Sequence, residues 1–215
     1  LMQEIQVALF DFDGTMTKGD SIADFVRFCL NKKVLPLSGF FSILAMTLLW
    51  KLGIVAVEKV KSLAVSPLHK MDESKAQSVC RQFVKERLIP RIYPDALTQL
   101  RRHHKAGHIV LIVSASPHCY MQYLKDALPL DGIIATRADS SGQIIKNVVG
   151  EEKKRQILLF MEQQQIKPDW ERSFAYGDSS NDLAMLHMTG HRFLINPKRN
   201  VRSMGNRIPI KYWRK

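Results

Sequence analysis

The sequence predicts an α/β fold: a doubly wound parallel sheet with helices on both faces, and an α-helical cap inserted after the first strand. Short apolar runs alternate with helical stretches, which is the pattern of such a sheet. A long, mostly helical stretch separates the first run from the second, too long for a simple crossover. We expect residues 1–16 and 91–215 to form the core and residues 17–90 to form the cap.

Five apolar runs are expected as strands. Each is short, partly β-branched or aromatic, and bounded by polar or glycine residues, as buried parallel strands are. The runs are Gln6–Phe10, His108–Ser114, Gly132–Thr136, Ser173–Gly177 and His191–Ile195.

Helices are expected between these runs and in the cap. Pro117 suits the opening position of a helix. The two cap segments have apolar residues at helical spacing. The expected helices are Ala23–Leu30, Asp72–Ile89, Pro94–Lys105, Pro117–Leu128 and Glu151–Gln165.

Composition and charge limit the possible functions. Hydrophobic residues make up 46% of the 215-residue chain, enough for a real core. The net charge is 32 − 20 = +12, which favours an anionic partner: nucleic acid, phosphorylated metabolites or anionic lipid. Cys29, Cys80 and Cys119 contain no CxxC pair and are expected as reduced thiols. The start has no basic region ahead of its apolar run, so we expect no signal peptide and a cytoplasmic location.

Polar side chains follow the expected strands where ligands bind in an open parallel sheet, beyond the carboxyl ends. A helix opening with Lys153 and Lys154 lies upstream of one such strand. The residues that follow the strands are Asp11, Asp13, Gly14 and Thr15; Ser114 and Ser116; and Asp178, Asn181 and Asp182.

Four carboxylates in one crevice would repel one another and raise their own pKa values unless a positive charge lay among them. Mg²⁺ prefers oxygen ligands and is usually held by one or two carboxylates together with a substrate phosphate. The sequence therefore predicts a magnesium site with a phosphoryl group beside it.

The ordered segments "DFDGT", "SAS", a lysine that opens a helix, and "GDSSND" resemble the four motifs of the haloacid dehalogenase superfamily, in particular its phosphatase branch. Each segment alone is common as a turn or a helix cap. Together, in this order at consecutive strand ends, they are specific. The resemblance covers Val7 to about Pro197 and implies a Rossmann-like core.

The resemblance also implies roles. Asp11 would be the nucleophile that forms an aspartyl-phosphate, and Asp13 the general acid and later the general base. Asp11, the backbone carbonyl of Asp13, and Asp178 would bind Mg²⁺, with Asn181 and Asp182 supporting the metal site. Dehalogenase members lack the second aspartate, so Asp13 favours phosphate chemistry.

Phosphoryl oxygens are expected to contact Ser114, Ala115 and a lysine, and Thr15 either binds phosphate or only shapes the turn. The spacing in "GEEK" favours Lys153, whereas aligning the following "QIL" with the phosphoserine phosphatase pattern favours Lys154. We predict Lys153.

The cap is expected to select the substrate, and its position resembles the subgroup that includes phosphoserine phosphatase. Asp20 is a candidate for binding a substrate amine or, alternatively, for capping a helix. From Cys29 to Cys80 the cap contains no arginine that could bind a carboxylate in a bidentate manner, so phosphoserine is disfavoured.

The cap also contains an uncharged run of 17 residues, Val34–Trp50, flanked by Lys32, Lys33 and Lys51. As a helix it would reach about 26 Å, short of a bilayer core of about 30 Å. A single span would also separate Asp11 from Ser114. The segment is therefore expected either to pack inside the cap or to dip into one leaflet.

The stretch Asn196–Lys215 is basic and without acid; it suits anionic lipid or simply solvent. These cap and tail features resemble the type C phosphatidylglycerophosphatases, so we predict a phospholipid head-group phosphate as substrate and peripheral contact with an anionic membrane on its cytoplasmic face. Two alternatives are a phosphatase of soluble metabolites, such as phosphoserine or histidinol phosphate, and a non-catalytic binder of anionic lipid. Nucleic acid is not expected, because no aromatic stacking surface accompanies the charge. The oligomeric state is not predicted.

Overall fold

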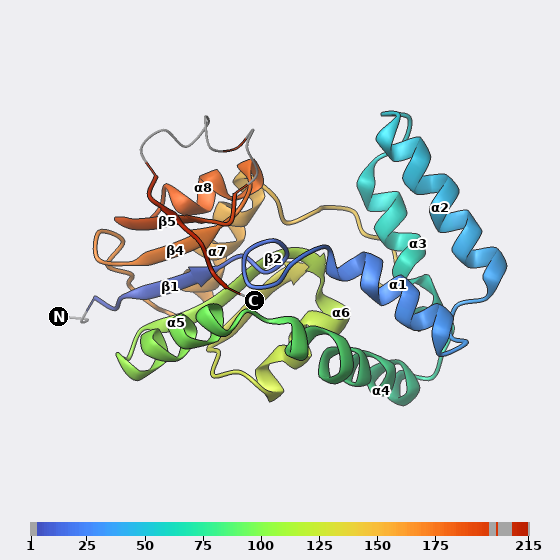
Figure 1. Cartoon of the computed structure of the whole chain (residues 1–215), viewed down its shortest axis with the longest axis horizontal. Coiled ribbons are helices and arrows are strands. Elements are labelled where there is room, and N and C mark those ends of the chain that lie inside the picture. The colour runs from blue at the N-terminus through green and yellow to red at the C-terminus, as the bar shows by residue number, and fades with distance from the viewer. Residues whose placement is uncertain (1–3, 198–200, 202–207, 215) are drawn as a thin grey trace.

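The computed structural model describes residues 4–197, 201 and 208–214 (Figure 1). Its centre is a sheet of six parallel strands in the order β3-β2-β1-β4-β5-β6. This order is that of a doubly wound sheet, so the predicted fold class is confirmed. The strands are β1 (Val7–Phe10), β2 (Ile109–Pro117), β3 (Gly132–Thr136), β4 (Phe174–Gly177), β5 (His191–Ile195) and β6 (Ile210–Lys211).

Alternate residues of β1 face two separate hydrophobic layers, as the two-residue period of a strand requires. Val7 and Leu9 pack with α7 (Glu151–Gln163) and α8 (Leu183–Leu186). The other face of the strand packs with α5 (Pro94–Lys105), α6 (His118–Met121) and the cap helices. The sheet is therefore buried on both sides, which explains why its strands read as continuous apolar runs.

Two expected helices are several residues shorter than predicted, and a third, expected at Glu151–Gln165, ends at Gln163. The one expected from Pro117 begins at His118, because Pro117 is still paired with β3 as the last residue of β2. It lasts four residues and continues as the 3₁₀ turn η3 (Gln122–Asp126). The helix expected at 72–89 is α4 (Glu73–Phe83), followed by the π-helical turn η1 (Val84–Leu88) and the 3₁₀ turn η2 (Ile89–Arg91). Pro90 lacks the N–H that a longer α-helix needs.

The segment between β1 and α5 is helical, as expected. It holds α1 (Ser21–Asn31), α2 (Leu37–Lys51), α3 (Val57–His69) and α4, which we call the cap helices; Figure 1 shows them to one side of the sheet, with α2 and α3 paired. Phe25 and Phe83 contact Tyr120 of α6 with ring centroids 5.0 and 5.1 Å apart, which anchors the cap helices to the core. The division into domains at residues 17 and 90 stays a prediction.

The apolar run in the cap forms α2. Ile43 is its buried residue, whereas Leu37, Phe41 and Leu48 are 61%, 59% and 59% exposed. Among the helices of the described residues, none is long and apolar enough to span a membrane. Helix α2 is thus an apolar helix that buries only one side, at Ile43, and exposes apolar side chains on the other.

Part of the basic stretch near the end of the chain is attached to the core. Trp213 packs against Phe10 and Tyr176, and Lys211 lies 3.6 Å from the centre of the Phe193 ring. This stretch supplies β6, which was not predicted. The other basic residues of the stretch lie outside the described residues, apart from Arg214: Lys198, Arg199, Arg202, Arg207 and Lys215.

His103 makes the stability of the core dependent on pH. Its ring nitrogens lie 2.9 Å from the Tyr176 hydroxyl and 2.9 Å from His108. Burial, and then the neighbouring His108, Arg102 and Lys211, lower the pKa of His103 to about 4. An unfolded histidine has a pKa of about 6.5. Between about pH 6.5 and pH 4 the unfolded chain therefore binds a proton that the folded protein does not, and the free energy of unfolding falls as the pH falls.

We expect this loss to reach up to about 1.4 kcal/mol per pH unit within that window. Urea unfolding of the wild type and of His103→Gln at a series of pH values measures it, because Gln cannot take up the proton. The variant should show the shallower slope of stability against pH. Equal slopes would contradict the assignment to His103.

Candidate active site

The candidate site lies where the strand order of the sheet reverses. Asp11 follows β1 and Asp178 follows β4, and these two strands are neighbours. The amide of Asp11 donates to the carbonyl of Tyr176 at 2.9 Å, which continues the pairing of the two strands to the site. Because the two strands are parallel, both side chains emerge at the carboxyl edge, where doubly wound sheets bind ligands.

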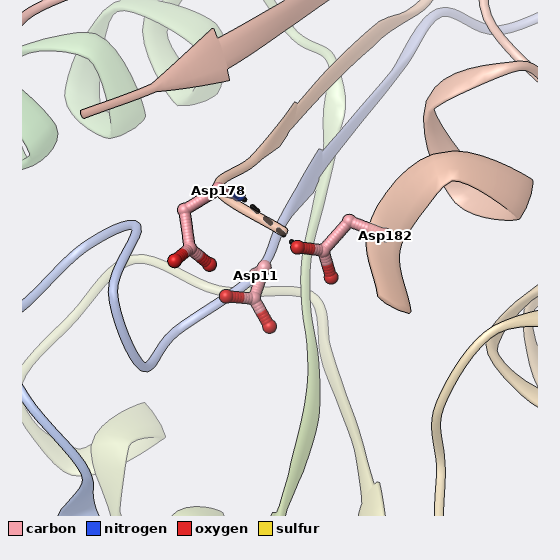
Figure 2. A group of neighbouring side chains, drawn as sticks. All are labelled: Asp11, Asp178 and Asp182. Atoms are coloured by element: carbon pink, nitrogen blue, oxygen red, sulfur yellow. Dashed lines mark hydrogen bonds between the residues drawn. The ribbon is translucent and has the colours of Figure 1, made fainter. Parts of the chain in front are cut away.

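Three carboxylates meet at this edge (Figure 2). One oxygen from each of Asp11, Asp178 and Asp182 lies within 4.8 Å of the others. The Lys153 ammonium lies among them, 2.6 Å from Asp11 Oδ1 and 2.7 Å from Asp182 Oδ1, and also donates to the carbonyl of Val113 at 2.9 Å. Lys153 is 1% exposed, so this cation is held wholly by the protein.

Burial and charge act against each other on these groups. Burial and the neighbouring Asp182 raise the pKa of Asp11 to about 6, although Lys153 and Thr15 favour its charged form. Burial also disfavours the charged form of Lys153, but Asp11 and Asp182 outweigh it and raise the pKa of Lys153. The lysine therefore stays charged at every physiological pH.

Asp13 has a different environment from Asp11. The Ser21 amide donates to its Oδ1 at 3.0 Å, the Ser21 hydroxyl to its Oδ2 at 2.8 Å, and the Ser116 hydroxyl also contacts Oδ2. Burial, with the charges of Asp20 and Asp11, raises the pKa of Asp13 to about 7 although these hydroxyls favour the anion. Two aspartates two residues apart thus differ in their partners: Asp11 contacts an ammonium, and Asp13 contacts hydroxyl groups.

The loop after β4 is tied together by Asp182. Its Oδ2 accepts hydrogen bonds from the amides of Asp178 and Ser179 at 3.1 and 3.0 Å, and from the Ser179 hydroxyl at 2.9 Å. The Asn181 carbonyl accepts from the amide of Gly150, just before α7, at 2.8 Å. These contacts fix the loop to the start of the helix that carries Lys153.

The remaining predicted residues also lie at the site. Ser114 is buried and accepts from the Ser116 amide at 3.0 Å; Thr15 donates to Asp11 Oδ2 at 2.9 Å. Asp20 accepts from the Ile22 amide and caps α1, one of its two expected roles. Lys154 is exposed, so Lys153 is the lysine that reaches the carboxylates. The structure brings together every predicted site residue, and their roles stay predictions.

A cavity of about 530 Å³ opens at these residues. Sequence reasoning missed Ser21, Lys61 and Trp50 as residues of this site, and it singled out Ser116 without its contact with Asp13. The Lys61 ammonium donates to the carbonyl of Ala115 at 2.6 Å and to Asn147 Oδ1 at 2.8 Å. Burial lowers the pKa of Lys61.

One signal in the sequence could have found Lys61. It shares a helical face with residues three, four and seven positions later, all of them buried: Ala64, Val65 and Leu68. A lysine on that face points into the structure rather than into solvent.

The donor set fits a hard divalent cation. Asp11 and Asp178 offer carboxylate oxygens within 4.8 Å of each other, and the backbone carbonyl of Asp13 is the third predicted ligand. Gly14 leaves this space open: a Cβ there would lie 2.3 Å from Asp178 Oδ2. Oxygen ligands of this kind suit Mg²⁺. The predicted magnesium ligands are therefore chemically suitable, and their binding of Mg²⁺ stays a prediction.

Comparison with known families adds an independent finding. Residues 8–187 match the model of the haloacid dehalogenase-like hydrolase family. The chain belongs to this family. The predicted superfamily is thus confirmed, and the chain is a hydrolase by family membership.

Two curated relatives differ in how much of their length this chain covers. A Streptomyces azureus protein named "Inhibition of morphological differentiation protein" is 28% identical over 152 residues, 68% of this chain and 48% of that protein. A "Histidinol-phosphatase" of Neisseria meningitidis is 20% identical over 206 residues, 89% of this chain and 90% of the relative. The chain thus spans about half the length of the first and nearly all of the second.

Solved structures share the fold. A Bordetella pertussis protein of unknown function superimposes with a TM-score of 0.85 at 17% identity, over 97% of this chain and 98% of the other. A phosphoserine phosphatase solved as a phospho-aspartyl intermediate analogue superimposes with a TM-score of 0.63 at 19% identity, over 99% and 95%. The phosphoserine-phosphatase-like neighbours expected for this fold are therefore found.

The close approach at Gly14 predicts a loss of metal binding on substitution. Gly14 has φ +89°, and Gly14→Ala would force Asp178 aside as well as strain the backbone. Gly53 in the cap has φ +74° with nothing near its missing side chain, so Gly53→Ala carries the strain alone. We expect Gly14→Ala to weaken Mg²⁺ binding at least about tenfold, which corresponds to a loss of roughly 1.4 kcal/mol of binding free energy. Titration calorimetry should show no such loss in Gly53→Ala; equal affinities in both would contradict the role of Gly14.

The ion pairs of Lys153 predict a large effect on stability. Lys153→Met leaves Asp11 and Asp182 buried without their cation, which should cost about 3–5 kcal/mol. Lys154→Met removes an exposed neighbour and should change the free energy of unfolding by less than about 0.5 kcal/mol. Urea unfolding in EDTA compares the two, and a similar stability in both variants would show that Lys153 does not hold the cluster.

Proposed function

We propose that this protein is a Mg²⁺-dependent phosphomonoester hydrolase that acts through an aspartyl-phosphate, and that its substrate is a phospholipid head-group phosphate. The observation that carries the chemistry is the pairing of Asp11, beside a buried ammonium, with Asp13, beside hydroxyl groups. A nucleophile and a proton carrier are thereby held next to each other. Family membership supports hydrolysis.

In the first step, a carboxylate oxygen of Asp11 attacks phosphorus and the bond from phosphorus to the ester oxygen breaks. The departing oxygen keeps the electron pair of that bond and takes a proton from Asp13. In the second step, water gives a proton to Asp13 and attacks phosphorus, and the bond to Asp11 breaks. Asp13 is suited to both directions because its pKa, raised by burial to about 7, lies near neutral pH.

The protein's own groups neutralise the phosphoryl charge. Lys153 supplies a permanent cation beside Asp11, and Thr15 keeps the Asp11 carboxylate oriented through its 2.9 Å hydrogen bond. Ser114 and the backbone at Ala115 line the cavity within which the phosphoryl group is expected. Mg²⁺ bound by Asp11, Asp178 and the Asp13 carbonyl would supply further positive charge against the phosphoryl oxygens.

The apolar helix α2 supports a lipid substrate. Its exposed leucines and Phe41 form a stripe unusual for a surface helix. Trp50, in its last turn, also lines the catalytic cavity. Lys51 ends the helix and Lys32 and Lys33 precede it, all exposed. An apolar stripe with flanking cations suits the cytoplasmic face of an anionic membrane, and it would bring the site to the lipid head groups.

A soluble phosphomonoester is the second candidate. It is favoured by the Neisseria meningitidis relative named "Histidinol-phosphatase", of which this chain spans 90%. A free amino acid or amino alcohol phosphate would need no apolar stripe on α2.

Measuring phosphate release tests both the proposed mechanism and the proposed substrate. With Mg²⁺ present, we expect turnover of phosphatidylglycerophosphate in mixed micelles to exceed that of phosphoserine and histidinol phosphate. Asp11→Asn should lower turnover by at least about 10⁴-fold, since the nucleophile is lost. EDTA should abolish release, and added Mg²⁺ should restore it.

The outcomes separate the mechanism from the substrate. Near-normal turnover by Asp11→Asn would overturn the aspartyl-phosphate mechanism. A preference for histidinol phosphate or phosphoserine would keep the mechanism and replace the lipid by a soluble ester.

A further inference from the structure

A second cavity, of about 260 Å³, lies inside the cap between α1, α2 and α3. Its lining is mostly apolar and includes Ile22, Val26, Phe40, Ile43, Val60 and Ala64. Exposed residues also line the cavity, among them Ala23 and Leu44, so it opens to solvent. A mostly apolar cavity that a ligand can enter from solvent is suited to an apolar ligand.

The cavity joins the catalytic site. Asp20, Ile22, Trp50 and Lys61 line both the catalytic cavity and the cap cavity. Lys61 is fixed at this junction by its hydrogen bonds to Ala115 and Asn147, at 2.6 and 2.8 Å. A molecule with its phosphate beside Asp11 can thus extend past Lys61 and Trp50 into the cap cavity.

The cap cavity also reaches the outside of α2. Leu44 lines it and is 49% exposed, on the same helix as Leu37, Phe41 and Leu48, which are exposed in turn. Apolar surface therefore continues from the catalytic cavity, through the cap, to the exposed side of α2.

We propose that the cap cavity binds an apolar chain of the substrate, an alkyl or acyl chain covalently part of the phosphomonoester that Asp11 attacks. This inference rests on the proposed hydrolase function and goes beyond it by naming the second binding site. The cavity is lined by α1, α2, α3 and the N-cap residue of α1, and shares only four lining residues with the catalytic cavity, so most of the residues that would contact the chain differ from those that contact the phosphate. The polar groups at the junction, Asp20 and Lys61, fit the polar atoms between phosphate and chain.

A series of alkyl phosphates of increasing length, each below its micelle-forming concentration, tests this without a membrane. Every methylene that enters the cavity should lower KM roughly fourfold, the equivalent of about 0.8 kcal/mol. The turnover number should change little, because the reacting atoms are the same. p-Nitrophenyl phosphate, which has no chain, reports the chemistry alone.

Substitutions that fill the cavity provide the controls. Ala64→Phe would occupy its interior, and Ala23→Phe, at an exposed lining position, would occupy its rim should the first variant not fold. Both should abolish the dependence of KM on chain length. Ala45→Phe makes the same change at an exposed position of α2 outside the lining. In this variant KM should still depend on chain length.

The possible failures are distinct. A KM that does not depend on chain length in the wild type, with p-nitrophenyl phosphate still hydrolysed, would overturn the chain site and leave the hydrolase intact. A dependence that survives Ala23→Phe and Ala64→Phe would also overturn it. No phosphate release from any of these esters would overturn the proposed function and this inference together.

Discussion

The buried ammonium of Lys153 is the charge on which the site depends. It contacts Asp11 and Asp182, which would otherwise be two buried anions near each other. Asp182 in turn holds the loop after β4 through three hydrogen bonds, and Asp178 lies in that loop. Removing the lysine would therefore disturb the nucleophile, the loop and the position of Asp178 together. A cation wholly held by protein also means that the carboxylates are arranged before any ligand binds.

The parallel sheet explains why residues so distant in sequence meet. Asp11 and Asp178 follow β1 and β4, and Ser114 lies near the end of β2, within the strand. The strands β2, β1 and β4 are consecutive neighbours. Parallel strands end at a common edge, and the reversal of strand order between β1 and β4 opens a crevice there. The polar side chains can gather at this edge without interrupting the core, because the apolar residues of the same strands pack against helices on both faces.

This constraint made much of the structure predictable. The five main strands could be predicted because buried parallel strands are apolar along their length. The site residues could be predicted because ligands bind at the carboxyl edge of such a sheet. Contacts between the cap and the core were not predictable in this way. Ser21 reaches Asp13 only because α1 begins beside it, and Lys61 reaches Ala115 only through the placement of α3. β6 is two residues long, too short to give a pattern.

The apolar character of α2 is hard to explain by stability alone. Ile43 faces the cap, but the exposed leucines of the helix contribute little to burial and favour association with other apolar surfaces. Helix α4 contributes to the same cap with a mostly polar exposed surface, so a cap of this kind does not require an apolar exterior. Trp50 connects the two apolar features, since it lies in the last turn of α2 and lines both the catalytic and the cap cavity. A substrate that is itself part apolar and part phosphate accounts for the exposed stripe, the cap cavity and the carboxylate site with a single ligand.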